Sequence, residues 1–200
     1  MIWEKNVKLV IMTCETTEGQ SKKCYYYWPK LSTSFSSNEL TLNNGYKIEA
    51  LSEKNITDNL TERNFSITNS NNEKKEVTQL HFRKWPDHGV PDLVETFETF
   101  EKINDIISLH YETYKSESPV VVHCSAGVGR TGTVISIYQI FYIAKKHLEK
   151  NLNNFNLNIF NIARRLKEQR RYMIQTSIQY ELVYKFTYIM LKKLALAFKK

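Results

Sequence analysis

Cysteine is scarce in this sequence: Cys14, Cys24 and Cys124 are the three among 200 residues. Such a small, odd number does not suit a disulfide framework and favours a reducing compartment, where free thiols persist. Long apolar runs are also lacking, and the N-terminus has no basic-then-apolar secretory pattern. These absences predict a cytoplasmic chain without a transmembrane segment, in which thiolate chemistry is permitted.

Internal repeats and low-complexity linkers are absent too, and 42% hydrophobic content over 200 residues suffices for one buried core. We therefore expect a single domain over residues 1–200. The net charge of +7 is compatible with nucleic acid, an acidic membrane surface or an acidic phospho-substrate. Because the lysines are spread along the chain, we interpret the charge as mainly a solvated surface and predict no nucleic-acid partner. The sequence leaves the oligomeric state open.

Short strands are predicted in the first half of the chain and helices in the second. Apolar runs and alternation predict strands over Lys8–Thr13, Tyr46–Leu51, Phe65–Thr68, Val77–Phe82 and Pro119–Val122. Helical spacing predicts helices over Asp92–Tyr111, from Gly129 to about Ile143, and roughly over Leu157–Arg171 and Ser177–Phe198. This order predicts an α/β (α+β) fold with a mixed, largely antiparallel central sheet flanked by helices.

The segment VVVHCSAGVGRTGT, residues 120–133, has the pattern of a buried strand, a glycine-bearing loop and the first turn of a helix. Gly127 and Gly129 let successive backbone N–H groups point inward, and the helix N-terminus adds the positive end of its dipole. We therefore expect an anion to bind in the loop formed by Ser125, Ala126, Gly127, Val128 and Gly129.

Two side chains frame this loop. Cys124 lies at its base, where amides and the helix dipole favour thiolate over thiol. Arg130, six positions on, offers a planar fork of donors that matches two phosphoryl oxygens. For a lone cysteine a structural role would be the better interpretation, but the pair around a glycine loop predicts a nucleophile and a phosphate clamp.

Two other anion or metal sites are disfavoured. A nucleotide-binding P-loop ends in Gly-Lys-Ser/Thr, whereas Gly129 is followed by Arg130. The three cysteines are scattered, and His123-Cys124 has no second ligand pair at the spacing of a zinc finger. We expect neither a metal nor another cofactor.

A tyrosine phenolate is a poor leaving group, so an acid must protonate it as the phosphate ester breaks. Asp87 is the candidate, because the segment WPDHGVP, residues 85–91, holds it between two prolines and near a glycine, as a hinged loop would. Without Cys124 the same segment would be interpreted as an ordinary turn.

The strings HCSAGVGRTG and WPDHGVP, with Gln175-Thr176 and Gln179-Tyr180, resemble the signature loop, the mobile acid loop and the glutamine loop of the phosphotyrosine-specific protein tyrosine phosphatases. The resemblance covers essentially the whole chain from Met1. It implies that family's fold and the hydrolysis of phosphotyrosine-containing proteins through a phosphocysteine intermediate.

The resemblance also implies catalytic roles. Cys124 would form the phosphocysteine, Arg130 would bind the phosphoryl group, and Asp87 would first donate and then accept a proton. Gln179, with Gln175, would position the water that hydrolyses the intermediate.

The resemblance implies that further residues support these catalytic side chains. Thr131 would hydrogen-bond the departing thiolate, and His123 would tune the cysteine. Glu18 resembles the residue that braces the signature arginine. Trp85 and Arg170 resemble the hinge and the support of the acid loop.

The chain departs from the family pattern at its start. Family domains normally begin well before the point that matches Met1, so we expect the fold to lack the N-terminal part and the aromatic loop that selects phosphotyrosine. A second hypothesis is therefore a pseudophosphatase that binds phosphotyrosine proteins without turnover. At Lys167 the family would have an arginine. The chain also resembles the tyrosine phosphatases of insect-associated polydnaviruses, which predicts action in the cytoplasm of a host cell.

Overall fold

The structure is a computed structural model that describes residues 1–31, 38–86, 89–150 and 156–197. Its central element is a sheet of strand order β4-β5-β6-β7-β1-β8. The strands are β1 Leu9–Met12, β4 Glu39–Thr41, β5 Lys47–Thr57, β6 Leu60–Thr68, β7 Lys74–Phe82 and β8 Val120–His123. Strand β1 pairs in parallel with β7 and β8, whereas the pairs from β4 to β7 are antiparallel. The predicted mixed, largely antiparallel sheet is confirmed.

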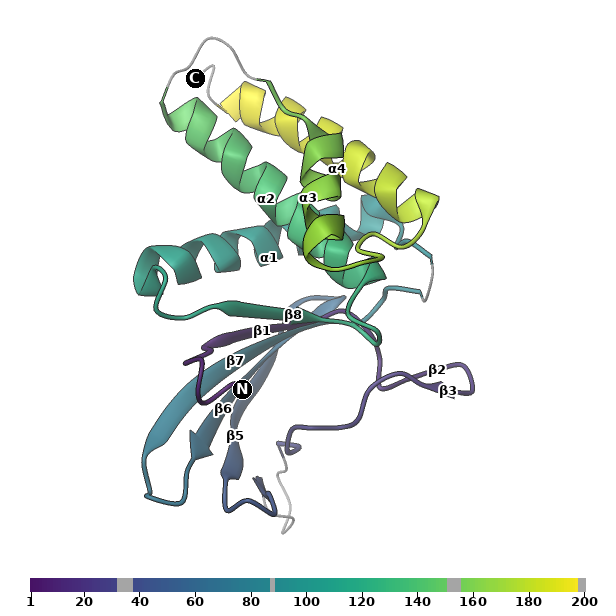
Figure 1. Cartoon of the computed structure of the whole chain (residues 1–200). Coiled ribbons are helices and arrows are strands. Elements are labelled where there is room, and N and C mark those ends of the chain that lie inside the picture. The colour runs from purple at the N-terminus through teal and green to yellow at the C-terminus, as the bar shows by residue number, and fades with distance from the viewer. Residues whose placement is uncertain (32–37, 87–88, 151–155, 198–200) are drawn as a thin grey trace.

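Four helices cover one face of this sheet (Figure 1). They are α1 Leu93–Tyr114, α2 Gly129–Glu149, α3 Ile159–Gln169 and α4 Ser177–Ala197. The predicted start of α1 is confirmed, because the Asp92 carboxylate accepts hydrogen bonds from the backbone of Val94 and Glu95 at 2.7 and 3.2 Å. Helix α2 is the central one, with apolar side chains packed toward β8 and toward α3 and α4.

The sequence did not indicate every strand. A small hairpin of β2 Thr17–Glu18 and β3 Ser21–Lys22 lies beside the main sheet, and β4 forms its outer edge. Strand β5 is also longer than predicted, because residues 51–55 are exposed and carry no apolar alternation. Pairing with β6 holds that polar half of β5 in place, with irregular register near Ala50.

The main core fills the space between the sheet and the helices. It includes strand residues and helix residues that are almost fully buried, among them Ile11, Leu80, Phe82, Phe100, Ile137, Ile140 and Phe186. All four residues of β1 are buried, as expected for a parallel strand with neighbours on both sides.

The parallel pairing of β1 and β8 positions the functional segment. Met12 pairs with His123, so both strands end at the same edge of the sheet. Beyond that register, the Thr13 N–H donates to the His123 carbonyl at 2.9 Å. The loop after β1, which carries the β2–β3 hairpin, therefore meets the loop that leads from β8 into α2. Within the described ranges, no helix combines the length and the apolarity that crossing a bilayer requires.

Candidate active site

The loop between β8 and α2 surrounds the thiol of Cys124. Its Sγ accepts hydrogen bonds from the Gly127 backbone N–H at 3.3 Å and from the Thr131 hydroxyl at 3.2 Å. Gly127 has φ +69°, a left-handed conformation that a glycine adopts without strain and that turns its amide inward. The predicted anion loop therefore directs donors at the sulfur of Cys124, a residue that is 6% exposed.

These donors set the protonation of the thiol. Burial, the largest single effect, raises the pKa of Cys124. Hydrogen bonds from the Thr131 hydroxyl and from the backbone N–H groups of Thr131, Val128 and Gly127 together outweigh it, so that the pKa is lowered from its ordinary value. The site therefore stabilises a sulfur anion.

We expect Thr131→Val to raise the pKa of Cys124, because the variant removes a donor to the thiolate while keeping a similar side-chain volume. Below the pKa the thiol is protonated and unreactive, so the rise of the iodoacetamide alkylation rate with pH should move to higher pH. Mass spectrometry of the modified peptide measures alkylation at Cys124 itself. An unchanged midpoint would contradict the role of Thr131, and Thr133→Val, whose hydroxyl donates to the Gly129 carbonyl at 3.0 Å instead, is the matched control.

Arg130 is held by two acceptors from other loops. Its Nη1 donates to Glu18 Oε1 at 2.5 Å and to the Trp85 carbonyl at 2.9 Å. The side chain is 2% exposed, and burial opposes its charge. The Glu18 hydrogen bond and the negative charges of Glu18 and Cys124 more than offset that effect and raise the pKa of Arg130. The guanidinium is therefore fixed as a cation close to the sulfur.

The predicted acid Asp87 lies outside the described residues, as does His88. The segment on either side of them is anchored by Trp85, whose ring is buried against Phe82 and Phe100. The Trp85 indole N–H donates to the Gly89 carbonyl at 3.1 Å and so ties the two ends of the segment together. The acid role of Asp87 stays a prediction.

Gln179, at the start of α4, faces the loop from the opposite side. Its Oε1 accepts from the Gln175 and Thr176 N–H groups at 3.0 and 3.3 Å. A Cβ atom on Gly129 would lie 2.9 Å from Gln179 Oε1 and 3.2 Å from the Gln175 Cβ. Glycine at 129 therefore lets both predicted glutamines pack directly against the anion loop.

The outer wall of the loop is supported by the segment that joins α3 to α4. Arg170 Nη2 donates to the Ala126 carbonyl at 3.1 Å, and the Ile174 N–H donates to the Val128 carbonyl at 3.2 Å. Arg170 therefore contacts the anion loop, and its role as the support of the acid loop stays a prediction. Lys167 Nζ donates to the Ile174 carbonyl at 3.1 Å and so holds α3 against this supporting segment.

A chain of polar side chains beneath the loop was not predicted. His123 Nδ1 lies 3.0 Å from the Cys124 carbonyl, and its Nε2 lies 2.7 Å from the Tyr27 hydroxyl. Tyr27 in turn accepts from Gln79 Nε2 at 2.8 Å. With the Tyr27 proton directed at His123 Nε2, His123 donates from Nδ1 and supports the backbone of Cys124. Burial is the main reason why the pKa of His123 is lowered.

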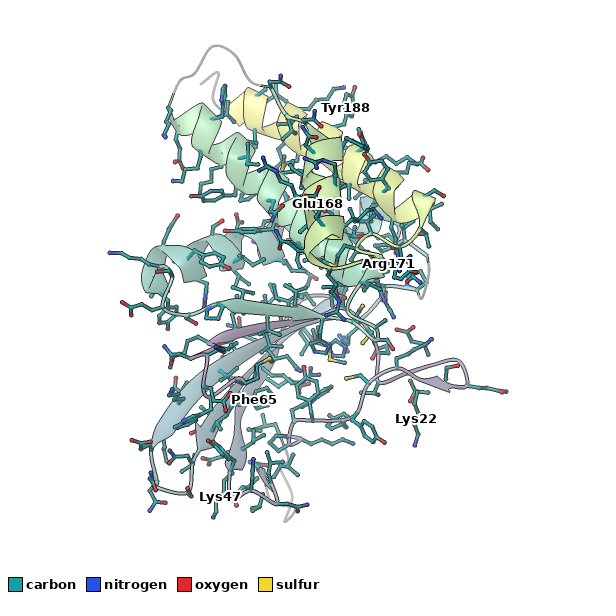
Figure 2. All side chains as sticks on the ribbon, in the orientation of Figure 1. Lys22, Lys47, Phe65, Glu168, Arg171 and Tyr188 are labelled. Atoms are coloured by element: carbon teal, nitrogen blue, oxygen red, sulfur yellow. The ribbon has the colours of Figure 1, made fainter. Side chains whose placement is uncertain are left out.

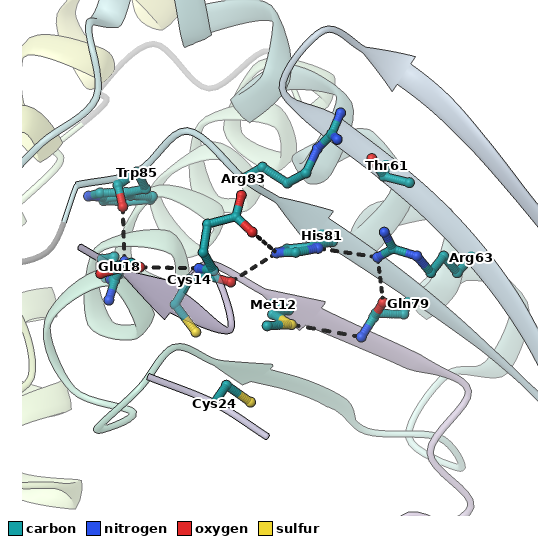
Figure 3. A network of polar contacts seen from close by, with 12 residues as sticks. Met12, Cys14, Glu18, Cys24, Thr61, Arg63, Gln79, His81, Arg83 and Trp85 are labelled. Atoms are coloured by element: carbon teal, nitrogen blue, oxygen red, sulfur yellow. Dashed lines mark hydrogen bonds and ion pairs between the residues drawn. The ribbon is translucent and has the colours of Figure 1, made fainter. Parts of the chain in front are cut away.

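The network of polar side chains extends from Gln79 to further residues of the sheet (Figure 3). Arg63 Nη1 donates to Gln79 Oε1 at 3.0 Å and lies 3.2 Å from His81 Nδ1. His81 Nε2 lies 2.9 Å from the Cys14 carbonyl. Burial lowers the pKa of His81 to about 4, so at neutral pH it is uncharged and donates from Nε2 to the loop that leads to Glu18. Sequence offers only the polar alternation of β6 and β7 as a signal for this network.

No group of three or more His, Cys, Asp or Glu side chains within residues 1–31, 38–86, 89–150 and 156–197 could hold a metal ion. The donors at the site are instead backbone N–H groups, a hydroxyl and a guanidinium. Such a set suits an oxyanion.

A thiol of lowered pKa inside an N–H-lined loop, with a guanidinium beside it, defines a thiolate site built to hold a phosphate-like anion. The family model for protein-tyrosine phosphatases matches residues 1–188 of the chain. The chain therefore belongs to the protein-tyrosine phosphatase family.

Relatives occur among both receptor and non-receptor phosphatases. The chain is 33% identical over 181 residues to the mouse receptor-type tyrosine-protein phosphatase eta and 34% identical over 186 residues to the human tyrosine-protein phosphatase non-receptor type 12. These alignments cover 90% and 92% of the chain but 13% and 22% of the two relatives. The chain thus spans a small part of these longer proteins.

Solved structures show the same fold. The catalytic domain of human protein tyrosine phosphatase non-receptor type 18 matches 95% of the chain with a TM-score of 0.77 at 26% identity. PTPN18 in complex with HER2-pY1196 phosphopeptides matches 94% of the chain, also with a TM-score of 0.77, at 25% identity. The chain spans 62% and 60% of those two solved chains.

Proposed function

We propose that this chain is a protein-tyrosine-phosphate phosphohydrolase that acts through a phosphocysteine intermediate. The observation that carries the proposal is the pair of donors on Cys124 Sγ, from Gly127 and Thr131, beside the clamped guanidinium of Arg130. A phosphate placed in the loop would meet the sulfur anion on one side and the Arg130 fork on another.

The steps follow from these groups. The Cys124 thiolate attacks phosphorus and displaces the tyrosine oxygen, which takes a proton from Asp87. Water positioned by Gln179 and Gln175 then attacks the phosphocysteine, and Asp87 accepts a proton from it. The sulfur leaves as a thiolate, which the Thr131 hydroxyl and the Gly127 N–H stabilise, and inorganic phosphate is released.

Phosphotyrosine in proteins is the proposed substrate class. Family membership supports it, as does the similarity to a phosphatase structure with bound phosphopeptides. Three free cysteines support a cytoplasmic location, and the structure describes all of them without a disulfide. The polydnavirus resemblance and action in a host cell stay predictions.

The alternative is a pseudophosphatase that binds phosphotyrosine without turnover. This alternative stays a prediction from the sequence, and the chain spans about 60% of the solved phosphatase chains that it matches. Cys124 and Arg130, with the contacts described above, support the enzyme instead.

We expect the purified chain to hydrolyse p-nitrophenyl phosphate and a phosphotyrosyl peptide. The matched phosphoseryl peptide should be hydrolysed at least about tenfold more slowly, because a serine alkoxide is a poorer leaving group than a tyrosine phenolate. Released phosphate measures the rates with and without EDTA. Vanadate, an oxyanion, should inhibit the reaction, and EDTA should leave it unchanged because the attacking group is a thiolate. Phosphopeptide binding without any turnover would support the pseudophosphatase, and inhibition by EDTA would contradict the mechanism.

A further inference from the structure

Arg63 is a buried cation on the face of the sheet that turns away from the helices. It lies on β6 two residues before Phe65, so both side chains project from the same face. Phe65 belongs to a cluster with Met12 and Trp28 rather than to the main core, and Figure 2 shows it away from the four helices. The Arg63 Nε donates to Glu53 at 2.7 Å, and the guanidinium lies over the Trp28 ring. These contacts fix the direction of the remaining guanidinium N–H groups.

The amide of Gln79 can satisfy its two neighbours in one orientation. Arg63 Nη1 lies 3.0 Å from the Gln79 side-chain oxygen (Figure 3), and a guanidinium has donors but no acceptor. Gln79 must therefore present its carbonyl to Arg63 and its amide N–H to the Tyr27 hydroxyl, 2.8 Å away. Gln79 is 1% exposed, so bulk water does not offer an alternative partner.

The same direction continues to the active site. Burial raises the pKa of Tyr27, so this residue keeps its proton at neutral pH. Because the Tyr27 oxygen accepts from Gln79, that proton is left for His123 Nε2, 2.7 Å away. Burial lowers the pKa of His123, so its ring carries one proton at neutral pH. With Nε2 acting as an acceptor, the ring proton lies on Nδ1 and is donated to the Cys124 carbonyl at 3.0 Å.

We propose that Arg63 and Gln79 are positioning residues of the active site. Together they set the direction of the hydrogen bonds that end at the Cys124 carbonyl, and so fix the tautomer of His123. The opposite direction would place a bare Nδ1 against the carbonyl oxygen, two acceptors with no proton between them. The peptide group that follows Cys124 would then lose its support at the start of the anion loop. The effect on turnover rests on the proposed function, whereas the tautomer can be measured without substrate.

His81 provides an internal reference for this direction. Its Nδ1 lies 3.2 Å from Arg63 Nη1, and its Nε2 lies 2.9 Å from the Cys14 carbonyl. Because Arg63 donates to this ring directly, His81 carries its proton on Nε2, and a change at Gln79 should leave it there. We therefore expect His81 and His123 to be opposite tautomers in the same protein.

Gln79→Glu reverses the direction at nearly constant side-chain size. The introduced carboxylate still accepts from Arg63 but has no proton for the Tyr27 oxygen, so Tyr27 donates to the carboxylate and His123 must carry a proton on Nε2. Isotope-edited NMR of the histidine rings distinguishes a protonated ring nitrogen from a bare one, and loss of a signal in His123→Gln assigns it. We expect His123 Nε2 to be bare in the wild type and protonated in Gln79→Glu, with His81 unchanged.

Turnover should follow the reversal. We expect kcat for p-nitrophenyl phosphate to fall about tenfold in Gln79→Glu, because the bare His123 Nδ1 no longer supports the Cys124 carbonyl. The thermal unfolding midpoint should stay within a few degrees of wild type. The matched control Gln139→Glu makes the same exchange on α2, in a groove that none of these residues lines. It should leave the His123 signals unchanged and kcat within about twofold.

A double variant tests whether the hydroxyl of Tyr27 transmits the direction. Tyr27→Phe removes that hydroxyl, so adding Gln79→Glu to it should leave the His123 signals as they are in Tyr27→Phe alone. If the introduced charge acted on His123 through space, the shift would persist in the double variant. That result would overturn the proposed hydrogen-bond route.

The outcomes separate this inference from the proposed function. A wild-type His123 protonated on Nε2 alone would overturn the inference without any variant. A folded Gln79→Glu chain in which His123 Nε2 stays bare would also overturn it, and a reversed direction with kcat kept within about twofold would overturn the positioning role. If the wild-type chain shows the expected tautomers but no turnover, the proposed function is wrong and the direction set by Arg63 stands.

Discussion

The variant Cys124→Ser is expected to lose turnover of p-nitrophenyl phosphate on the order of 10⁴-fold or more. The donors from Gly127 and Thr131 can stabilise a sulfur anion, but the pKa of a serine hydroxyl is far too high for the same contacts to make an alkoxide. Phosphopeptide binding should persist, since the loop N–H groups and Arg130 remain. Steady-state kinetics and anisotropy on the same preparation measure both.

The matched control is Cys24→Ser, which makes the same chemical change at a half-buried thiol. Cys24 donates to the Tyr25 carbonyl and packs at the edge of the apolar cluster that includes Cys124, but burial raises its pKa, so this variant should keep turnover within about threefold. Residual turnover in Cys124→Ser above about one per cent, or a comparable loss in Cys24→Ser, would contradict the assignment of the nucleophile. A phosphorylated peptide containing residue 124, found by mass spectrometry in rapidly quenched wild-type reactions, would support it directly.

The three cysteines show how environment decides reactivity. Burial raises the pKa of Cys14 to about 12, and the nearby Arg130 charge lowers it only in part. Burial also raises the pKa of Cys24. Cys124 is buried as well, yet its pKa is lowered, because it alone of the three receives several hydrogen bonds from the loop. A thiol becomes a nucleophile here through the donors around it.

Much of the fold followed from the sequence because its signals are local. The four helices have long apolar faces, and Asp92 is a strong start signal, so their existence and approximate bounds were confirmed. The polar half of β5, the edge strand β4 and the hairpin β2–β3 carry no such pattern. They form through pairing with neighbours, which a single segment cannot reveal.

In the candidate site, too, the residues of one contiguous segment could be predicted, whereas contacts from distant segments could not. The anion loop is a contiguous segment, so Cys124, Gly127 and Thr131 could be located from spacing and chemistry. The Trp85 carbonyl that holds Arg130 and the Tyr27 hydroxyl that contacts His123 come from distant segments. Their contacts depend on the parallel pairing of β1 with both β7 and β8, which brings the ends of these strands to one edge of the sheet. A tryptophan or a tyrosine taken alone in the sequence does not indicate such a partner.

Gly132 is a further residue whose importance the sequence alone did not show. A Cβ atom at this position would lie 2.5 Å from the Ile174 nitrogen, which is backbone and cannot move aside like a flexible side chain. The glycine therefore sets how closely α2 approaches the segment that holds Gln175 and Gln179. The sequence motif shows only that a glycine follows Thr131. The need for a glycine at this position becomes clear from the close packing against the Ile174 backbone.

The second large effect is expected for Arg130→Lys, which should lower kcat/KM for p-nitrophenyl phosphate about 10³-fold while keeping the positive charge. The Arg130 Nη1 donates to Glu18 and to the Trp85 carbonyl, and these two contacts fix the plane of the guanidinium beside the anion loop. A lysine ammonium is a single point that cannot satisfy these acceptors and also grip two oxygens. Steady-state kinetics measure the loss.

Controls separate charge from geometry. Arg171→Lys makes the same exchange at an exposed residue whose guanidinium lies over the Tyr172 ring, and it should change kcat/KM less than about twofold. Glu18→Gln keeps Arg130 but weakens its clamp, so its loss should fall between the two. Thermal unfolding midpoints within a few degrees of wild type would show that the Arg130→Lys chain is folded. If that folded variant kept kcat/KM within tenfold, a bidentate grip on phosphate by Arg130 would be wrong, and charge alone would account for its place in the loop.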